Sequence, residues 1–296
     1  MHVNNILKMA NRFLKLAELS QTEVEQLGQD RPGSQYPYVK KEDWGKFREY
    51  LKERSLKSNP KLDPELTAYT PGETVNLLNH PKIIEWFNKI KNFRIPENYK
   101  TIALVPCAKT KPWGRTRPKS SDLYNAYHEI IEKNQSGELK IAPIYFVTIS
   151  EPLGVVPQDF WDDFPQYDNP GLFSDPVMRS GGLFTRDYSK TPIGTKHIIP
   201  FDEKAYEEAI SKLGMTIGEF IRNNNIPGRV FISFVEDPSG KIKTTHSHML
   251  DVANIPDILP SEHRHDKPKG KTSKNRISPT EHYIGKLTEI SQKLNK

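Results

Sequence analysis

The chain has a single cysteine, Cys107, among its 296 residues. One cysteine cannot form a disulfide within the chain, and it excludes zinc and iron–sulfur sites built from several thiolates. No apolar run approaches the roughly 20 residues that a helix needs to cross a bilayer. We therefore expect a cytoplasmic protein that does not contact membranes.

The N-terminus lacks the uninterrupted apolar segment of a signal peptide. Residues 1–21 have apolar side chains at helical spacing, interrupted by Lys8, Arg12 and Lys15. This pattern is typical of an amphipathic docking helix, and a basic organellar presequence would share it.

Positive charge is in excess, because the chain has 43 Lys and Arg residues and only 37 Asp and Glu residues. The resulting formal charge of +6 favours anionic partners without indicating which kind.

The apolar pattern changes near residue 100. Residues 1–98 predict a helical N-terminal region with linkers, in which Pro81 separates two helices. Residues 99–255 contain three short apolar runs, "TIALVPCA", "KIAPIYFVTIS" and "GRVFISFVE", with amphipathic helices between them. This order predicts a short, mainly parallel sheet in an α/β core domain. Residues 256–296 predict a basic, partly disordered tail.

A basic loop follows the first predicted strand. In α/β proteins ligands bind beyond the carboxyl ends of the strands, so this loop is a candidate phosphate site at the start of the next helix. Trp113 would stack on a base there. The alternative is a solvated loop without a ligand. The substrate-binding candidates of the loop are Arg115, Arg117, Lys119 and Ser121.

Four residues are candidates for catalysis. Cys107 is either a buried small side chain or a thiolate. Lys111 is either a nucleophile or a phosphate contact. Glu151 follows the second strand on a turn restricted by prolines, and Asp168 is a second acid for proton transfer.

Two histidines in "TTHSHML" are the further candidates for a metal. On a strand, His246 and His248 would point to the same face. A pair without further ligands is more typical of ordinary surface or core-edge histidines. No cofactor is evident from the sequence.

Two blocks of residues together resemble the core domain of the archaeosine synthases, which has relatives near the archaeal tRNA-guanine transglycosylases. The first block is Pro106, Cys107, Lys111, Pro112 and Trp113. The second is Pro152, Leu153, Gly154, Val155, Val156, Pro157, Tyr167 and Asp168.

The resemblance implies a fold and an activity. The fold would be a three-layer α/β/α sandwich of the uracil-DNA-glycosylase type, to which the N-terminal helices would be an appendage. The activity would be addition of an amino donor to the nitrile of a preQ0-type 7-deazaguanine in nucleic acid, either tRNA or DNA. A transglycosylase or another protein of the 7-deazaguanine pathway would be a partner. Pro106, Pro112, Trp113, Gly154 and Tyr167 would contact the substrate.

The chain departs from the family pattern after the first block. Thr116 and Lys119 stand where the family has a serine and a histidine, so the role of that histidine is moved or lost. The chain also lacks room for complete transglycosylase and PUA-type domains. Two other functions stay open: a non-catalytic nucleic-acid-binding module, and a glycosylase-like hydrolase in which Asp168 activates water.

Overall fold

The computed structural model describes residues 44–108, 111–114, 122–138, 143–169, 172, 202–235, 245–255, 258–260 and 285. The predicted N-terminal docking helix, the linker after it and most of the predicted tail lie outside these residues. The chain divides into two units, one of residues 1–80 and 166–209 and one of residues 81–165 and 210–296.

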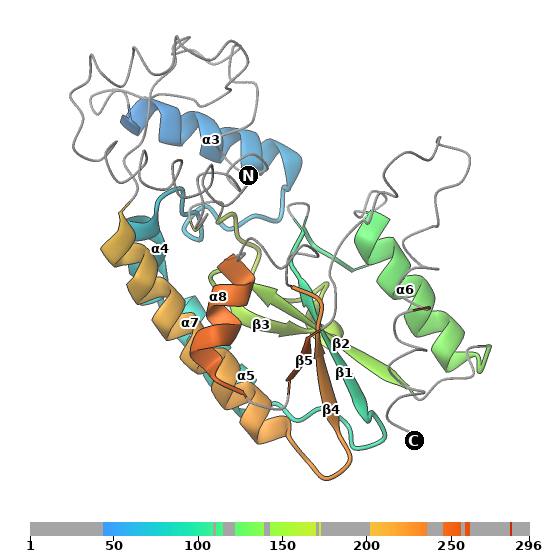
Figure 1. The fold of residues 1–296 in the computed structure, drawn as a ribbon. Coiled ribbons are helices and arrows are strands. Elements are labelled where there is room, and N and C mark those ends of the chain that lie inside the picture. Colours follow the sequence, from blue (N-terminus) through green and yellow to red (C-terminus); the bar gives the residue numbers. More distant parts are fainter. Residues whose placement is uncertain are drawn as a thin grey trace, which may run out of the picture. The chain divides into compact units, whose positions relative to one another are not determined.

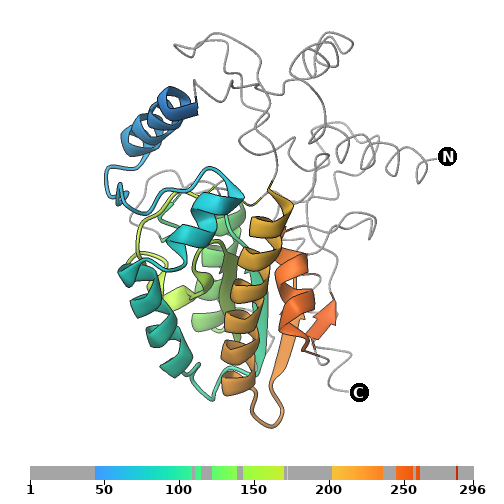
Figure 2. The same ribbon diagram turned by 90° about the vertical axis from the view of Figure 1, so that its left-hand side faces the viewer.

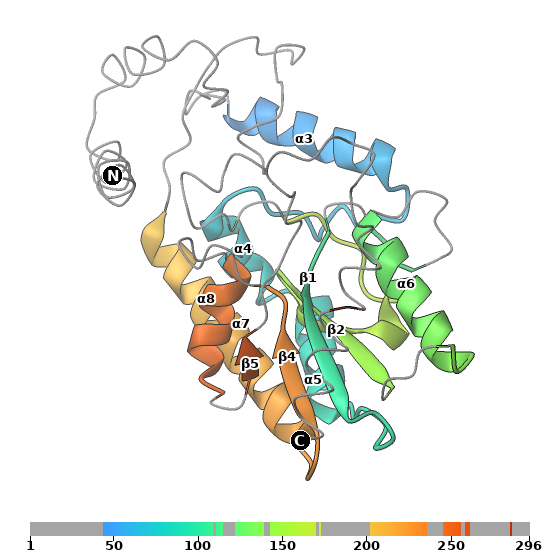
Figure 3. The same ribbon diagram turned by 45° about the vertical axis from the view of Figure 1, so that its right-hand side comes forward.

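The second unit contains a five-stranded sheet. Its strands are β1 (Thr101–Pro106), β2 (Ile144–Ser150), β3 (Gly154–Pro157), β4 (Val230–Ser233) and β5 (Ile258–Pro260). Their spatial order is β3-β2-β1-β4-β5, and every neighbouring pair is parallel except β2 and β3. Figure 3 shows β1 between β2 and β4. The predicted mainly parallel α/β sheet is confirmed.

Helices flank both faces of this sheet. They are α5 (Pro81–Asn92), α6 (Asp122–Gln135), α7 (Glu203–Asn224) and α8 (Thr245–Ala253). Helix α6 lies against one face, and α5, α7 and α8 lie on the other (Figures 1 and 2). The indole N–H of Trp86 in α5 donates to the carbonyl oxygens of Leu153 and Val155, which fixes α5 beside β3.

Hydrophobic burial explains the main elements. All seven residues of β2 are buried, and β1 is buried from its second residue onward, as expected of strands covered on both faces. In α7, Leu213, Ile217 and Phe220 recur at helical spacing and are fully buried. None of the helices among the described residues combines the length and apolar character needed to cross a bilayer.

The first unit contains α3 (Trp44–Ser58) and α4 (Pro71–Leu77), both predicted from the sequence. Helix α4 begins with a variant of the capping box. The Thr70 side chain accepts from the Glu73 N–H, and the Glu73 carboxylate accepts from the Tyr69 N–H. Residues 66–68 pair with Asp168 through two backbone hydrogen bonds, so residues distant in sequence join this unit.

Three sequence predictions are corrected. Helix α5 belongs to the unit with the sheet, whereas the sequence predicts it within the N-terminal region. The "TTHSHML" segment forms α8, not a strand, because Thr245, Met249 and Ala253 recur at helical spacing and are buried. Residues 258–260, predicted as tail, form β5 and pair with β4.

Close packing of α7 against α8 gives a testable prediction. A Cβ at Gly214 would lie 2.6 Å from Cβ of Val252 and 2.8 Å from the carbonyl oxygen of Met249. We expect Gly214→Ala to lower the free energy of unfolding in urea by about 1–3 kcal/mol. In α3, the described residues leave open space around Gly45. Gly45→Ala should therefore stabilise by about 0.5–1 kcal/mol. Equal stability of the two variants would contradict this packing.

Candidate active site

The candidate site lies at the carboxyl ends of β1 and β2. Pro106 is in register with Ile149 in the parallel pair, so Cys107 and Glu151 follow two strands that end at the same edge. The Cys107 N–H donates to the Ile149 carbonyl oxygen at 3.0 Å and extends the ladder by one bond. A proline-containing turn from Glu151 leads into β3, whose first residue, Gly154, has a φ of +70°.

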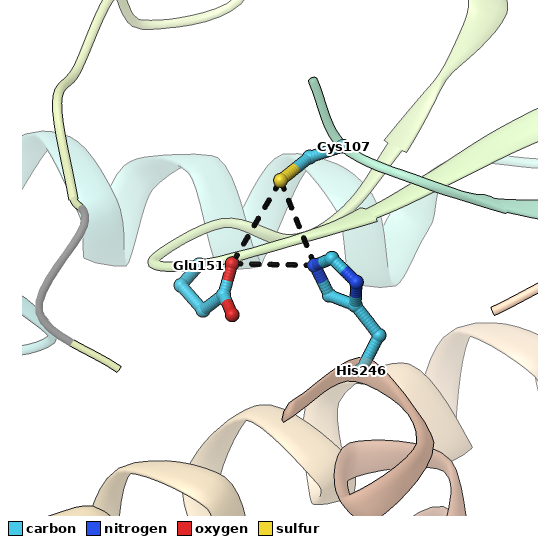
Figure 4. Close-up of side chains that lie close together, drawn as sticks. All are labelled: Cys107, Glu151 and His246. Atoms are coloured by element: carbon cyan, nitrogen blue, oxygen red, sulfur yellow. Dashed lines mark hydrogen bonds and ion pairs between the residues drawn. The ribbon is translucent and has the colours of Figure 1, made fainter. Parts of the chain in front are cut away.

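Helix α8 supplies the third side chain. The connection from β1 leads to β2, and the later connection through α7 returns to β4 on the opposite side of β1. Ligands of open α/β sheets bind where the strand order reverses in this way. His246, near the start of α8, meets Cys107 and Glu151 there (Figure 4).

These three residues form the Cys107–Glu151–His246 cluster. The distance from His246 Nε2 to Glu151 Oε2 is 3.3 Å, and from His246 Nε2 to Cys107 Sγ it is 3.6 Å. Cys107 Sγ lies 3.9 Å from Glu151 Oε2. The thiol and the carboxylate therefore both contact the same ring nitrogen of His246.

Burial and charge shift the pKa values of the Glu151–His246 pair in opposite directions. Burial alone raises the pKa of Glu151, but the charge of His246, its hydrogen bond and the charge of Lys111 hold that pKa below its ordinary value. Burial alone lowers the pKa of His246, but the interactions with Glu151 and Cys107 raise it to about 10. Each partner therefore favours the charged form of the other.

Lys111 is the fourth member of the site. Only 7% of its surface is exposed, and its charge acts on the Glu151 carboxylate. The peptide bonds Lys111–Pro112 and Glu151–Pro152 are both cis. The structure thus brings together three of the four catalytic candidates, Cys107, Lys111 and Glu151.

Trp113 holds the segment that carries Lys111. Its backbone N–H donates to the Trp161 carbonyl oxygen, and its indole N–H donates to the carbonyl oxygen of Ala108. Its own carbonyl oxygen lies 2.8 Å from His128 Nε2. These bonds connect residues 111–114 to the core.

The stacking role predicted for Trp113 is wrong. Its side chain is 1% exposed and stacks between Tyr124 and Phe164, with ring centroids 5.3 and 4.8 Å away. Both faces of the indole are covered by the protein's own rings, so a substrate base cannot stack on it. The aromatic character of this motif position is explained by packing.

The other predicted residues fall into three groups. Pro106, Pro112 and Gly154 are buried beside the site residues in the chain. Tyr167 and Asp168 belong to the first unit, where the Asp168 carboxylate accepts a hydrogen bond from Ser55. Arg115, Arg117, Lys119 and Ser121 lie outside the described residues, so their predicted roles stay predictions.

His246 and His248, which would share one face on a strand, do not pair in this way on a helix. On helix α8, residues two apart point in different directions, and the contacts of His246 are to Cys107 and Glu151. The sequence indicated His246 only through its two-residue spacing from His248.

Comparison with known proteins adds no relative to this picture. No protein family, characterised protein or solved structure matches the chain.

The cluster offers a thiol, an imidazole, a carboxylate and a neighbouring amine in a largely buried position. In nucleophile–histidine–acid triads the acid contacts the ring nitrogen opposite the one that contacts the nucleophile. Here both contacts are to Nε2, so the three groups do not form such a relay. Cys107, Glu151 and His246 are instead arranged as three donors around a common point, and these are the residues that could hold a metal.

Proposed function

We propose that the protein is an enzyme that adds an amino group to the nitrile of a preQ0-type 7-deazaguanine base in nucleic acid. The observation that carries the proposal is the buried meeting of Lys111 and Glu151 beside Cys107 at the carboxyl edge of the sheet. Cys107 and Lys111 belong to one motif of the archaeosine synthase resemblance, and Glu151 directly precedes the other.

The fold is compatible with the same family. A mainly parallel sheet with helices on both faces supports assignment to the uracil-DNA-glycosylase type of sandwich. The formal charge of +6 favours a polyanionic substrate, either tRNA or DNA, in the cytoplasm. A transglycosylase that installs the base would be the natural partner.

We assign the nucleophile to Lys111. Glu151 accepts a proton from the Lys111 ammonium, the resulting ε-amine attacks the nitrile carbon, one N–C bond forms, and a proton moves from that nitrogen to the nitrile nitrogen to give an amidine. An amine donor, either ammonia or a primary amine, then attacks the amidine carbon, and the Lys111 amine leaves. No oxidant or reductant is consumed, and Glu151 is assigned the proton transfers.

Nucleoside analysis tests this function. The purified protein is incubated with tRNA and with duplex DNA that contain preQ0, in the presence of ammonium, glutamine or lysine. After digestion, mass spectrometry should show loss of the preQ0 nucleoside and an equal gain of an amidine nucleoside with its glycosidic bond intact.

The same assay separates the alternatives. Release of free base with an abasic site would identify a glycosylase and overturn the proposal. Unchanged nucleosides with every donor, together with binding that weakens steeply with salt, would identify a non-catalytic binding module.

A further inference from the structure

We propose that Cys107, Glu151 and His246 bind one divalent transition-metal ion, with Zn²⁺ as the best match. The proposal stands on the positions of three side chains and holds for any reaction at the site. Each residue offers one donor atom, namely Sγ, Oε2 and Nε2, and the three atoms lie within 4.8 Å of one another.

The distances between the donors match a tetrahedral zinc site. Zinc bonds of about 2.3 Å to sulfur and about 2.0–2.2 Å to nitrogen and oxygen place tetrahedral donors about 3.5 Å apart for S–N and S–O and about 3.3 Å apart for N–O. The observed separations are 3.6 Å for Sγ–Nε2 and 3.3 Å for Nε2–Oε2. The Sγ–Oε2 separation of 3.9 Å would shorten slightly on binding.

Hydrogen bonding explains the positions of these three donor atoms less well than metal binding does. A single Nε2–H cannot point at both Sγ and Oε2, since one hydrogen serves one acceptor well. A metal ion at the centre satisfies all three donors at once. Thiolate and carboxylate ligands carry two negative charges, which a divalent ion neutralises in this buried position.

The donor types select the metal. A thiolate and an imidazole disfavour Mg²⁺ and Ca²⁺, which prefer oxygen ligands, and suit Zn²⁺. Three protein ligands are typical of catalytic zinc sites, which keep a fourth position for water or substrate. One consequence rests on the proposed function: an ion that bound the nitrile nitrogen at this fourth position would polarise the nitrile.

The backbone holds the three donors in place before any ion arrives. Cys107 and Glu151 directly follow paired strands, and His246 lies on α8, whose close approach to α7 depends on Gly214 and Gly218. Donors on such rigid elements need only small shifts to bind a metal.

Metal analysis of the untagged full chain tests the proposal. The protein is stripped with a chelator, equilibrated with Zn²⁺ or Co²⁺, freed of excess ion and measured by mass spectrometry. We expect one equivalent per chain. The Co²⁺ form should show a thiolate charge-transfer band and the strong visible bands of a four-coordinate ion.

Matched variants assign the ligands. Cys107→Ser and His246→Ala should each weaken Zn²⁺ binding by about 100-fold or more, since even loss of an outer-shell partner costs about 10–100-fold. His248→Ala, on the same helix, should retain the full equivalent. Circular dichroism verifies that each variant is folded.

One readout uses the unaltered protein in case the variants do not fold. Zn²⁺ should slow alkylation of Cys107 in the wild-type chain, and a chelator should restore the rate. The proposal is overturned if the wild-type chain takes up no stoichiometric metal, or if the Co²⁺ form lacks the thiolate band. Because neither readout involves a nucleoside, failure here is distinguishable from failure of the proposed reaction.

Discussion

Lys111→Met is expected to lower the rate of amidine formation by at least about 10³-fold, because removal of a nucleophile eliminates the covalent route. Methionine keeps an apolar stem of similar length in this buried position, where only 7% of Lys111 is exposed. The fold should therefore persist. The rate is measured from the appearance of the amidine nucleoside under single-turnover conditions.

Lys111→Arg separates reaction from binding. Arginine keeps the positive charge and can contact phosphate, but its guanidinium stays protonated and is not a nucleophile. If Lys111 reacts, the arginine variant should be as inactive as the methionine variant. Activity of Lys111→Arg within about tenfold of wild type would assign Lys111 a binding role only.

A surface lysine provides the control. Lys91 has 56% of its side chain exposed and pairs with Glu219 at 2.7 Å. Lys91→Met should change stability by no more than about 1 kcal/mol and leave the rate unchanged, since exposed ion pairs contribute little.

Trp113→Ala is expected to lower the free energy of unfolding by about 3–5 kcal/mol, the usual cost of removing a large buried aromatic side chain. The substitution removes the stacking with Tyr124 and Phe164 and the indole hydrogen bond to Ala108. Because Trp113 anchors the segment of Lys111, activity should fall as well. Urea unfolding followed by circular dichroism measures the stability.

The outcome distinguishes two roles of this tryptophan. A residue that stacked on substrate would lose affinity for nucleic acid on truncation without a comparable loss of stability. Met215→Ala is the control, because Met215 is apolar but 57% exposed. We expect that variant to stay within about 0.5 kcal/mol of wild type. A Trp113→Ala protein as stable as Met215→Ala would contradict the packing role.

The three central strands, β1, β2 and β4, were predictable because they are buried on both faces. β1, β2 and β4 are runs of apolar residues that are conspicuous against a basic sequence, and α6 and α7 have clear helical periodicity. β5 was not predictable in this way. It has only three residues, which is too short a run to show the apolar pattern of a strand, and a polar, basic segment follows it.

The part of the site that follows directly from the ends of the strands was predictable. Cys107, Lys111 and Glu151 follow β1 and β2, and parallel strands bring their carboxyl ends to one edge. His246 depends on how α8 packs against α7, and the paired threonines before it favour a strand on local propensity. Trp113 beside a cationic loop resembles a stacking residue, and its burial depends on rings from distant segments.

The order in which the site residues are synthesised follows from this architecture. His246 comes 139 residues after Cys107 in the chain. At about 5–20 residues per second, ribosomes add His246 about 7–28 s after Cys107. In that interval β1 and β2 are available to pair, while the thiol and carboxylate still lack their histidine. The complete Cys107–Glu151–His246 cluster therefore forms late in synthesis, and only chains that have been synthesised and folded through α8 contain it.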